Sequence, residues 1–246
     1  MTPRLVGVGV GPGDPELVTV KAVRVMQESD VVLVPVMGDD VVGRAEEVVR
    51  RHVDASKVRR AVFALSDRGG LTARREEAWD AAGRAVADAF ASGASTVSFA
   101  TIGDPNVYST FAYLAATVRT LVPGVEVGTV PGITAMQDLA SRSGTVLCEG
   151  TESLALLPLT AGLPAYEAAL ASFDTVVAYK GGRHLPAVVE ALRAAGRLDD
   201  AVFGAAMGLP DEDVRPLADV EHGVEAPYLS TVVAPARRHT GRGGKL

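Results

Sequence analysis

Short apolar runs alternate along this chain with longer stretches in which apolar residues recur at helical spacing. In the first half, the apolar runs predict strands at 4–10, 30–34, 61–65 and 95–100. The longer stretches predict helices at 15–28, 39–52, 72–92 and 107–120. Each predicted strand is nearly continuous in apolar residues instead of alternating, which indicates that helices cover both faces of the sheet. The pattern therefore predicts an α/β fold.

The second half differs from the first after Leu121-Val122-Pro123-Gly124, a turn that marks a candidate domain boundary. Beyond it, the pattern predicts a helix at 184–195 and short strands at 125–130, 155–159, 173–179, 201–207 and 229–234. More short strands and fewer long helices favour a mixed sheet in this half. We therefore predict two α/β domains, residues 1–122 and 123–238, followed by a flexible tail at 239–246.

The first turn, from Gly7 to Leu17, follows a strand and leads into a helical pattern. Glycines at alternate positions allow the backbone to bend sharply or to lie close against a ligand. Asp14 is placed to cap the helix, with Pro15 at its first position. The dinucleotide-binding spacing fails, because Pro12 or Asp14 occupies the position of its third glycine, and no Gly-Lys-Ser/Thr follows. A tight turn that binds no ligand is the alternative for this stretch.

Two later stretches repeat the arrangement of strand, glycine turn and helix start. In Gly103-Asp104-Pro105, the Asp-Pro pair is predicted to open a helix directly after a strand. In Val130-Pro131-Gly132-Ile133-Thr134, Thr134 and Gln137 have the spacing of a capping box, so a helix should begin at Thr134. All three turns lie at carboxyl ends of predicted strands, where open α/β sheets bind ligands. Well-capped structure without a ligand is the alternative for each turn taken singly.

Composition and charge exclude several classes of function. The chain carries 30 acidic and 24 basic residues, a net charge of −6, which argues against nucleic acid as the main partner. The single cysteine, Cys148, excludes an internal disulfide and a metal cluster built from cysteines. No apolar run is long enough to span a membrane, and no signal-peptide core precedes the first strand, so a cytoplasmic protein is expected.

The side chains that usually carry metal or nucleophilic catalysis are sparse. The sequence contains no His-x-x-x-His, no Gly-x-Ser-x-Gly and no cysteine–histidine pair, so neither a bound metal nor a catalytic triad is expected. The histidines are scattered and are predicted to face solvent: His52, His184, His222 and His239. This leaves chemistry in which the protein mainly positions its reactants.

The three turns together resemble the signatures of the tetrapyrrole (corrin/porphyrin) methyltransferases, which use S-adenosylmethionine. The resemblance covers essentially the whole chain apart from the tail and rests on Gly9-x-Gly11-Pro12-Gly13-Asp14-Pro15-Glu16-Leu17-x-Thr19, Gly103-Asp104-Pro105 and Val130-Pro131-Gly132-Ile133-Thr134-Ala135. Longer strings are similar to the precorrin-2 C20-methyltransferase branch of this family, and they lie at 100–111, 131–140, 154–159 and 179–183.

The resemblance implies a fold of two α/β domains, usually in a homodimer, with the cofactor in the cleft between them and a substrate trough in the first. Its motifs imply cofactor contacts at Pro12, Ile102, Gly103, Asp104, Val107, Thr134, Ala135, Tyr179, Lys180, Gly208, Leu209 and Pro210. Asp104 would face polar amino-acid or ribose groups of the cofactor. Lys180 stands where many members of the family carry methionine, and it fits the precorrin-2 branch.

The reaction implied by the resemblance is C-methylation of precorrin-2, or of its cobalt form, at C20 to give precorrin-3A in cobalamin biosynthesis. The cofactor would leave as S-adenosylhomocysteine, and the protein would align the reactants and exclude water. Substrate contacts are expected at Gly11, Gly13, Asp14 and Tyr108, of which Asp14 and Tyr108 are the polar catalytic candidates. The substrate's carboxylates require basic side chains, for which the candidates are Arg44, Arg68, Arg74 and Arg183.

Three other functions remain open at this point. The first is methylation at another tetrapyrrole position, such as C2/C7 or C11. The second is a methyltransferase of the same fold that acts on a diphthamide precursor or on ribosomal RNA, although RNA fits poorly with the acidic charge balance. The third, from another class, is a non-catalytic module that binds S-adenosylmethionine without turnover.

Overall fold

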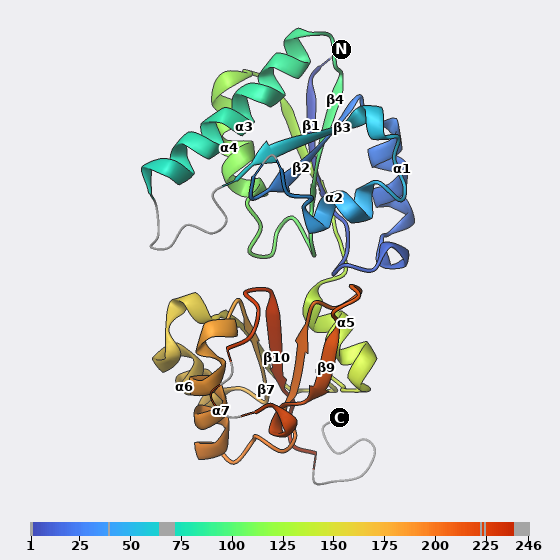
Figure 1. The fold of residues 1–246 in the computed structure, drawn as a ribbon. Helices are drawn as coiled ribbons and strands as arrows, with labels where there is room; N and C mark the ends of the chain where they lie inside the picture. Colours follow the sequence, from blue (N-terminus) through green and yellow to red (C-terminus); the bar gives the residue numbers. More distant parts are fainter. Residues whose placement is uncertain (1, 39, 64–71, 222, 224, 239–246) are drawn as a thin grey trace. The chain divides into compact units, whose positions relative to one another are not determined.

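The computed structural model describes residues 2–38, 40–63, 72–221, 223 and 225–238, so the tail expected at 239–246 lies outside the described residues. The chain divides into two compact units, Met1–Thr134 and Ala135–Leu246. The boundary expected at 122/123 differs from this division, because β5 (Glu126–Val130) pairs in parallel with β1 (Arg4–Gly9) and belongs to the first sheet. In Figure 1 the first unit runs from blue to green and the second from yellow-green to red.

The first unit is built on a five-stranded sheet in which every neighbouring pair is parallel, in the order β3-β2-β4-β1-β5. Its other strands are β2 (Val31–Val36), β3 (Val58–Val62) and β4 (Thr96–Thr101). Its helices are α1 (Val20–Glu28), α2 (Arg44–Val49), α3 (Ala73–Ala91) and α4 (Phe111–Leu121), with short 3-10 turns at Pro15–Leu17 and Ala55–Lys57.

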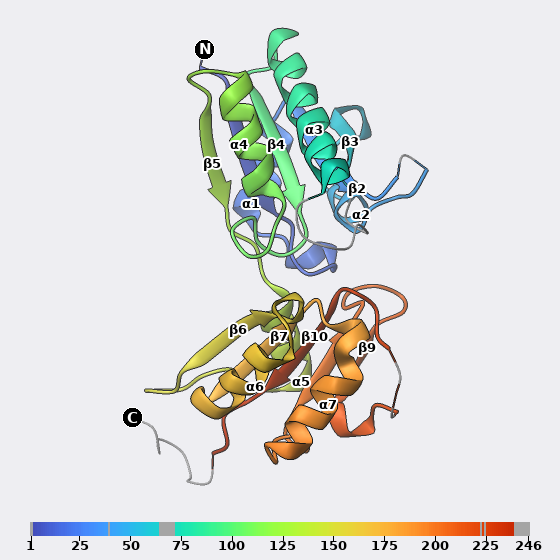
Figure 2. The same cartoon turned by 90° about the vertical axis from the view of Figure 1, so that its left-hand side faces the viewer.

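Helices cover both faces of this sheet, as the continuous apolar strands predicted. One core packs α1 and α2 against residues such as Val8 and Val34, and the other packs α3 and α4 against Leu5 and Phe99. Figure 1 and Figure 2 show the two helix pairs on opposite sides of the strands. The result is a three-layer α/β/α arrangement whose strand ends all point the same way.

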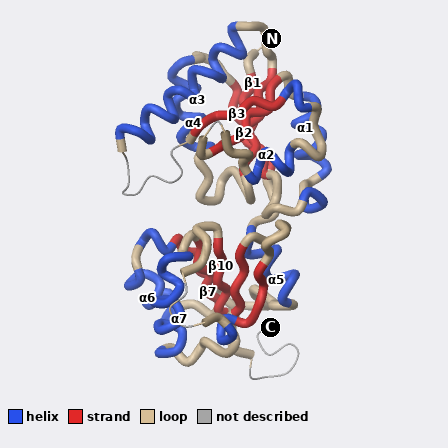
Figure 3. The backbone as a smooth tube through the Cα atoms, viewed as in Figure 1, coloured by secondary structure: helices blue, strands red, loops and turns tan. Residues whose placement is uncertain are grey.

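The second unit is built on a mixed sheet, which confirms the expectation for this half of the chain. Figure 3 shows its strands in red. The strand order is β6-β7-β10-β8-β9, with β6 and β7 parallel and the remaining pairs antiparallel. The strands are β6 (Leu154–Pro158), β7 (Thr175–Tyr179), β8 (Val202–Ala205), β9 (Asp213–Pro216) and β10 (Ser230–Ala234). The helices α6 (Leu163–Ser172) and α7 (Leu185–Ala194) lie on one face, and α5 (Ala135–Ser143) lies on the other. Short 3-10 turns lie at Leu159–Ala161, Gly182–His184 and Leu217–Asp219.

The helix predicted at 15–28 is wrong as one continuous element. Asp14 caps only a 3-10 turn, accepting a hydrogen bond from the Glu16 N–H at 2.8 Å, and Val18 then adopts an extended conformation. Thr19 caps the true helix by accepting from the Ala22 N–H at 3.1 Å. Two competing N-caps lie five residues apart in the sequence, and the chain uses both of them.

The structure corrects two further expectations of local structure. The Asp-Pro pair at 104–105 does not open a helix, because residues 104–110 form an irregular turn and α4 starts at Phe111. The sequence pattern also missed α6 and β9. Most residues of α6 are alanine, leucine or other apolar residues and lie on all sides of the helix, so no polar stripe marks its periodicity.

Candidate functional site

The connections of the first sheet define a topological switch point between β1 and β4. The chain leaves β1 through α1 to β2 on the far side of β4, and it leaves β4 through α4 to β5 on the far side of β1. The first connection packs α1 on one face of the sheet, and the second packs α4 on the other. Neighbouring strands whose connections leave toward opposite faces form a crevice at their carboxyl ends, which is where open α/β sheets bind ligands. The sequence stretches that follow β1 and β4 are two of the three glycine turns.

All three glycine turns meet at this point, backbone against backbone. A Cβ on Gly9, at the end of β1, would stand 2.5 Å from the Gly103 carbonyl oxygen and 2.6 Å from the Gly132 nitrogen. The Gly103 N–H donates to the Gly11 carbonyl at 2.8 Å, which joins the turns after β1 and β4. Only glycine, which has no Cβ, allows three backbone segments to approach this closely. Gly9 and Gly132 stood in the sequence motifs, but their mutual contact had no sequence signal.

Asp104 holds two of these turns together. One carboxylate oxygen accepts the Asn106 N–H at 2.8 Å, and the other accepts the Gly132 N–H at 3.0 Å. The side chain is buried, with 8% of its surface exposed. A buried carboxylate with two backbone donors is a strong local restraint. These two hydrogen bonds therefore make Asp104 a clamp between the second and third turns.

The second turn exposes an open surface beside the clamp. Gly103 has a φ of +70°, and no atom lies within 4 Å of the place where its Cβ would stand. Further along the turn, Tyr108 has a φ of 50°, and its side chain is 42% exposed. Burial of part of the ring raises the pKa of the Tyr108 phenol, so it stays protonated at neutral pH. The Val107 N–H donates to the Asp104 carbonyl at 3.2 Å, and Ile102 is half-buried.

The loop after β1 is constrained by its own backbone. Gly11 has a φ of +77°, and a Cβ there would stand 2.7 Å from the Leu17 carbonyl oxygen. Pro12 and Gly13 are buried, and Asp14 is half-buried as the cap of the 3-10 turn. Gly11 is therefore required by the turn itself, whether or not a ligand lies against it.

The site residues expected in the second unit lie where β7 and β8 have their carboxyl ends. The Tyr179 hydroxyl, at the end of β7, accepts the Met136 N–H in the first turn of α5 at 2.8 Å. Lys180 follows with a φ of 58°, and its ammonium lies 6.0 Å from the centre of the Tyr228 ring. The α5 helix begins at Ala135, directly after the buried Thr134, which confirms the predicted helix start.

The turn after β8 lies at the same edge and carries the remaining expected residues. The Leu209 N–H donates to the Ala206 carbonyl at 3.0 Å, and Gly208 has a φ of 77°. Pro210 is exposed. Because β7 and β8 are both antiparallel to β10, they run parallel to each other and their carboxyl ends share one edge.

Of the four arginines expected around the substrate trough, the structure describes three. Arg44 begins α2 and Arg74 lies in the first turn of α3, both in the first unit. Arg183 lies in the second unit, where its Nε contacts the His184 ring at 3.0 Å. Arg68 falls outside the described residues.

Two histidines also differ from expectation, because His52 and His184 are half-buried rather than facing solvent. The His52 ring forms a hydrogen bond with the Pro15 carbonyl at 2.9 Å. His222 and His239 lie outside the described residues. Among the residues that the structure describes, no group of three or more His, Cys, Asp or Glu side chains is placed to hold a metal ion.

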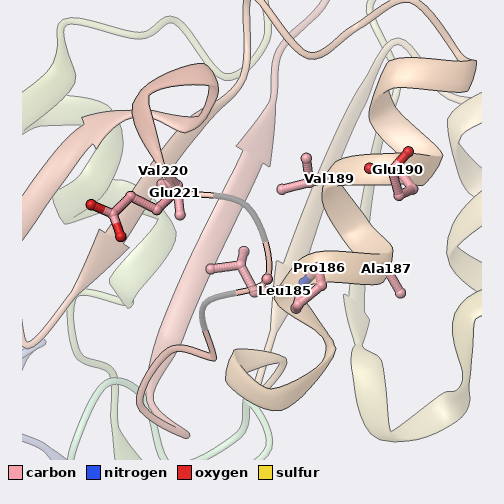
Figure 4. A pocket seen from close by; sticks show the side chains of 8 residues that line it. Leu185, Pro186, Ala187, Val189, Glu190, Val220 and Glu221 are labelled. Atoms are coloured by element: carbon pink, nitrogen blue, oxygen red, sulfur yellow. The ribbon is translucent and has the colours of Figure 1, made fainter.

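A cavity of about 230 Å³ lies elsewhere in the second unit, beside α7 (Figure 4). Its lining is mostly apolar and includes Leu185, Val189 and Val220. It is smaller than the roughly 300–1,000 Å³ of ordinary ligand pockets. None of the expected site residues lines it, so we do not assign it to the reaction. In the described part of the chain, no helix is both long and apolar enough to cross a membrane.

Comparison with known proteins agrees with this geometry. Residues 4–221 match the family model described as Tetrapyrrole (Corrin/Porphyrin) Methylases, and the chain belongs to this family. It is 36% identical over 239 residues to a precorrin-2 C(20)-methyltransferase of Sinorhizobium sp., covering 94% of this chain and 95% of that protein. It is 28% identical over 235 residues to a cobalt-precorrin-2 C(20)-methyltransferase of Salmonella typhimurium, covering 95% and 96%.

A solved structure supports the fold. The uroporphyrin-III C-methyltransferase from Thermus thermophilus, complexed with S-adenosylhomocysteine, superposes with a TM-score of 0.63 at 23% identity and covers 94% of this chain and 97% of that one. This likeness confirms the predicted α/β fold of two units.

Proposed function

We propose that this chain transfers a methyl group from S-adenosylmethionine to C20 of precorrin-2, in cobalamin biosynthesis. The observation that carries the proposal is the 36% identity, over nearly the full length of both proteins, with a precorrin-2 C(20)-methyltransferase. The Salmonella typhimurium relative acts on the cobalt form, so the same proposal covers cobalt-precorrin-2.

The residues at the switch point fit a cofactor of this kind. Gly103 leaves open space beside a left-handed backbone, as required where a ligand lies against the main chain. Pro12, Ile102, Asp104 and Val107 belong to the two turns that meet at Gly103. In the second unit, Tyr179, Lys180 and residues 208–210 share one sheet edge. We assign these groups to cofactor binding, together with Thr134 and Ala135, and the place expected for the cofactor between the two units stays a prediction.

The chain's own residues contribute positioning. When bound, S-adenosylmethionine supplies an electrophilic methyl group. The Asp104 clamp and the contact among Gly9, Gly103 and Gly132 keep the turns around the reacting groups from moving apart. The Tyr108 hydroxyl stays protonated at neutral pH, so it can donate a hydrogen bond to the substrate but does not accept a proton. The Asp14 carboxylate holds the loop after β1 through the Glu16 N–H.

The proposal also includes a homodimer, as the family resemblance implies, and action in the cytoplasm, as expected from the sequence. Light scattering on the purified chain tests the oligomer, and fractionation of the producing cell tests the compartment. Neither result bears on the chemistry of a single chain.

The experiment that tests the function is transfer of label from methyl-labelled S-adenosylmethionine to precorrin-2 and, in a parallel reaction, to cobalt-precorrin-2. We expect turnover with at least one of them, and uroporphyrinogen III serves as the comparison substrate. Binding of S-adenosylhomocysteine without turnover on any of the three would support the non-catalytic module instead. Turnover on uroporphyrinogen III alone would assign methylation to another position.

A further inference from the structure

The turn after β8 is held in a conformation that its sequence disfavours. Among the described residues, the left-handed region is occupied by three residues other than glycine, and each follows the carboxyl end of a strand: Tyr108, Lys180 and Ala206. Ala206 has a φ of 50°, where its Cβ is crowded and glycine would fit without strain. Lys180 and Ala206 follow β7 and β8, which lie two strand spacings apart, or about 10 Å. Backbone strain of this kind persists only where the surroundings impose it, and it concentrates at ligand sites.

A carboxylate adds a side-chain restraint to the backbone hydrogen bonds of this turn, which run from the Leu209 N–H to the Ala206 carbonyl and from the Glu212 N–H to the Leu209 carbonyl. The Gly208 N–H donates to Glu212 Oε2 at 2.7 Å, which closes the stretch from 208 to 212. The Arg142 Nη1 on α5 contacts both oxygens of Glu212, at 2.9 and 2.7 Å. Glu212 therefore links the turn to a helix on the face of the sheet.

Arg142, the partner of Glu212 on α5, is itself held by a second carboxylate. The Arg142 Nε donates to Asp138 at 2.8 Å, and the Asp138 side chain is only 4% exposed. Arg142 and Glu212 are 24% and 32% exposed, so their ion pair is partly shielded from solvent. Burial lowers the pKa of the Arg142 guanidinium, but hydrogen bonds and charge from Asp138 and Glu212 outweigh it and raise the pKa overall. The Arg142 guanidinium therefore stays charged throughout the working range of an enzyme.

We propose that Glu212, held by Arg142, is a positioning residue that keeps the turn at 206–210 in its left-handed shape as a preformed seat for the cofactor. The inference rests on the proposed function, because it takes S-adenosylmethionine as the ligand. Glu212 does not touch the ligand in this account. It acts through the Gly208 N–H and through the conformation of Ala206.

The test compares binding of S-adenosylhomocysteine, measured by calorimetry, in single and double variants. Glu212→Ala should raise Kd at least ten-fold, because the turn loses its side-chain restraint, keeps only its backbone hydrogen bonds and relaxes away from the left-handed shape. Glu212→Gln keeps an acceptor for the Gly208 N–H and should raise Kd less than three-fold. Asp213→Asn is the matched control, since Asp213 lies on the same hairpin in an exposed pair with Arg215 and should leave Kd unchanged.

Ala206→Gly distinguishes positioning from general stability. Glycine adopts this conformation without strain, so in the Ala206→Gly background the loss caused by Glu212→Ala should fall below three-fold. In turnover assays, Glu212→Ala should raise KM for S-adenosylmethionine while kcat at saturation stays within two-fold. If Glu212→Ala fails to fold, Arg142→Gln takes its place, and it should raise Kd several-fold, again less in the Ala206→Gly background.

The failures of the two proposals are distinguishable. If the unaltered chain does not bind S-adenosylhomocysteine, the proposed function is overturned, and this inference with it. If the unaltered chain binds, and folded Glu212→Ala or Arg142→Gln binds equally well, the positioning role alone is overturned. An equal loss with alanine and with glycine at position 206 would also overturn it.

Discussion

Replacing Asp104 by alanine removes the bond between the second and third turns, and its cost can be worked out from the structure. A hydrogen bond from a backbone N–H to a charged acceptor contributes about 1.5–3 kcal/mol. Both bonds are partly buried, but Asn106 is an exposed residue whereas Gly132 is half-buried, so after the change the Asn106 N–H reaches water more easily and its bond counts for less. We expect Asp104→Ala to lower the free energy of unfolding by about 2–4 kcal/mol. For a chain of this length the corresponding fall in Tm is roughly 4–16 °C.

The same change should weaken cofactor binding, because the turn that carries Gly103 is no longer held against Gly132. We expect the Kd of S-adenosylhomocysteine to rise at least ten-fold, which corresponds to about 1.4 kcal/mol. Asp104→Asn keeps one acceptor oxygen and should lie between alanine and the native residue in both measurements. Thermal unfolding and calorimetric titration on the same preparations give the two quantities.

Asp30 provides a matched control in the same sheet, at the amino ends of the strands and away from the three turns. Its carboxylate accepts the N–H groups of Ser95 and Thr96 at 2.8 and 2.9 Å, at the amino end of β4. Asp30→Ala should therefore lower Tm and leave Kd unchanged. If Asp104→Ala had the same Tm as the unaltered chain, the two hydrogen bonds of Asp104 would not contribute the free energy of unfolding that the geometry indicates. If it lost stability but bound the ligand normally, the clamp would not shape the site.

Three further predictions follow from single residues. Gly103→Ala should fold, with a free energy of unfolding lower by about 1–2 kcal/mol because alanine must adopt a left-handed backbone. It should also weaken S-adenosylhomocysteine binding, because the added methyl fills open space beside the switch point, and unchanged affinity would place the ligand elsewhere. Glu46 is fully buried and pairs with both Arg60, at 2.8 Å, and Arg50, at 2.7 Å. Because Arg50 remains as a partner, Arg60→Met should cost about 1.5–3 kcal/mol in chemical denaturation, as expected for the loss of one charged hydrogen-bond partner, and a cost below about 1 kcal/mol would contradict this. The N–H groups of Thr96 and Ser95 hold the pKa of Asp30 below its ordinary value. The stabilisation by Asp30 is therefore full above about pH 4 and is lost as the pH falls through the folded-state pKa. Asp30→Asn should make the free energy of unfolding less dependent on pH below about pH 4, and an unchanged dependence would refute the assignment.

Local sequence signals predicted the positions of the three glycine turns but not the bonds between them. Continuous apolar strands indicated a sheet covered on both faces, and the glycines after each strand marked its carboxyl end. The bond from Asp104 to Gly132 joins residues 28 positions apart, and the Arg142–Glu212 pair joins residues 70 positions apart. Pairing over such distances leaves no local pattern, so only the folded chain shows which turns are held together.

The errors of the sequence interpretation have the same origin. A proline-glycine turn before β5 looked like a domain boundary, yet the sheet position of β5 depends on its pairing with β1. Asp14 and Thr19 are both good N-caps, and local preference could not decide that each would cap a separate element. The role of Asp104 in facing the cofactor stays a prediction, and its two bonds to backbone N–H groups are what the sequence did not indicate.

The position of the transferred methyl group tests the central claim most directly. Precorrin-2 and the purified chain are incubated with S-adenosylmethionine carrying ¹³C in its methyl group, and the product is examined by ¹³C nuclear magnetic resonance. The account predicts one enriched methyl signal, with the methyl group bonded to C20. Enrichment at any other carbon, or no enrichment with either precorrin-2 or its cobalt form while S-adenosylhomocysteine still binds, would contradict it.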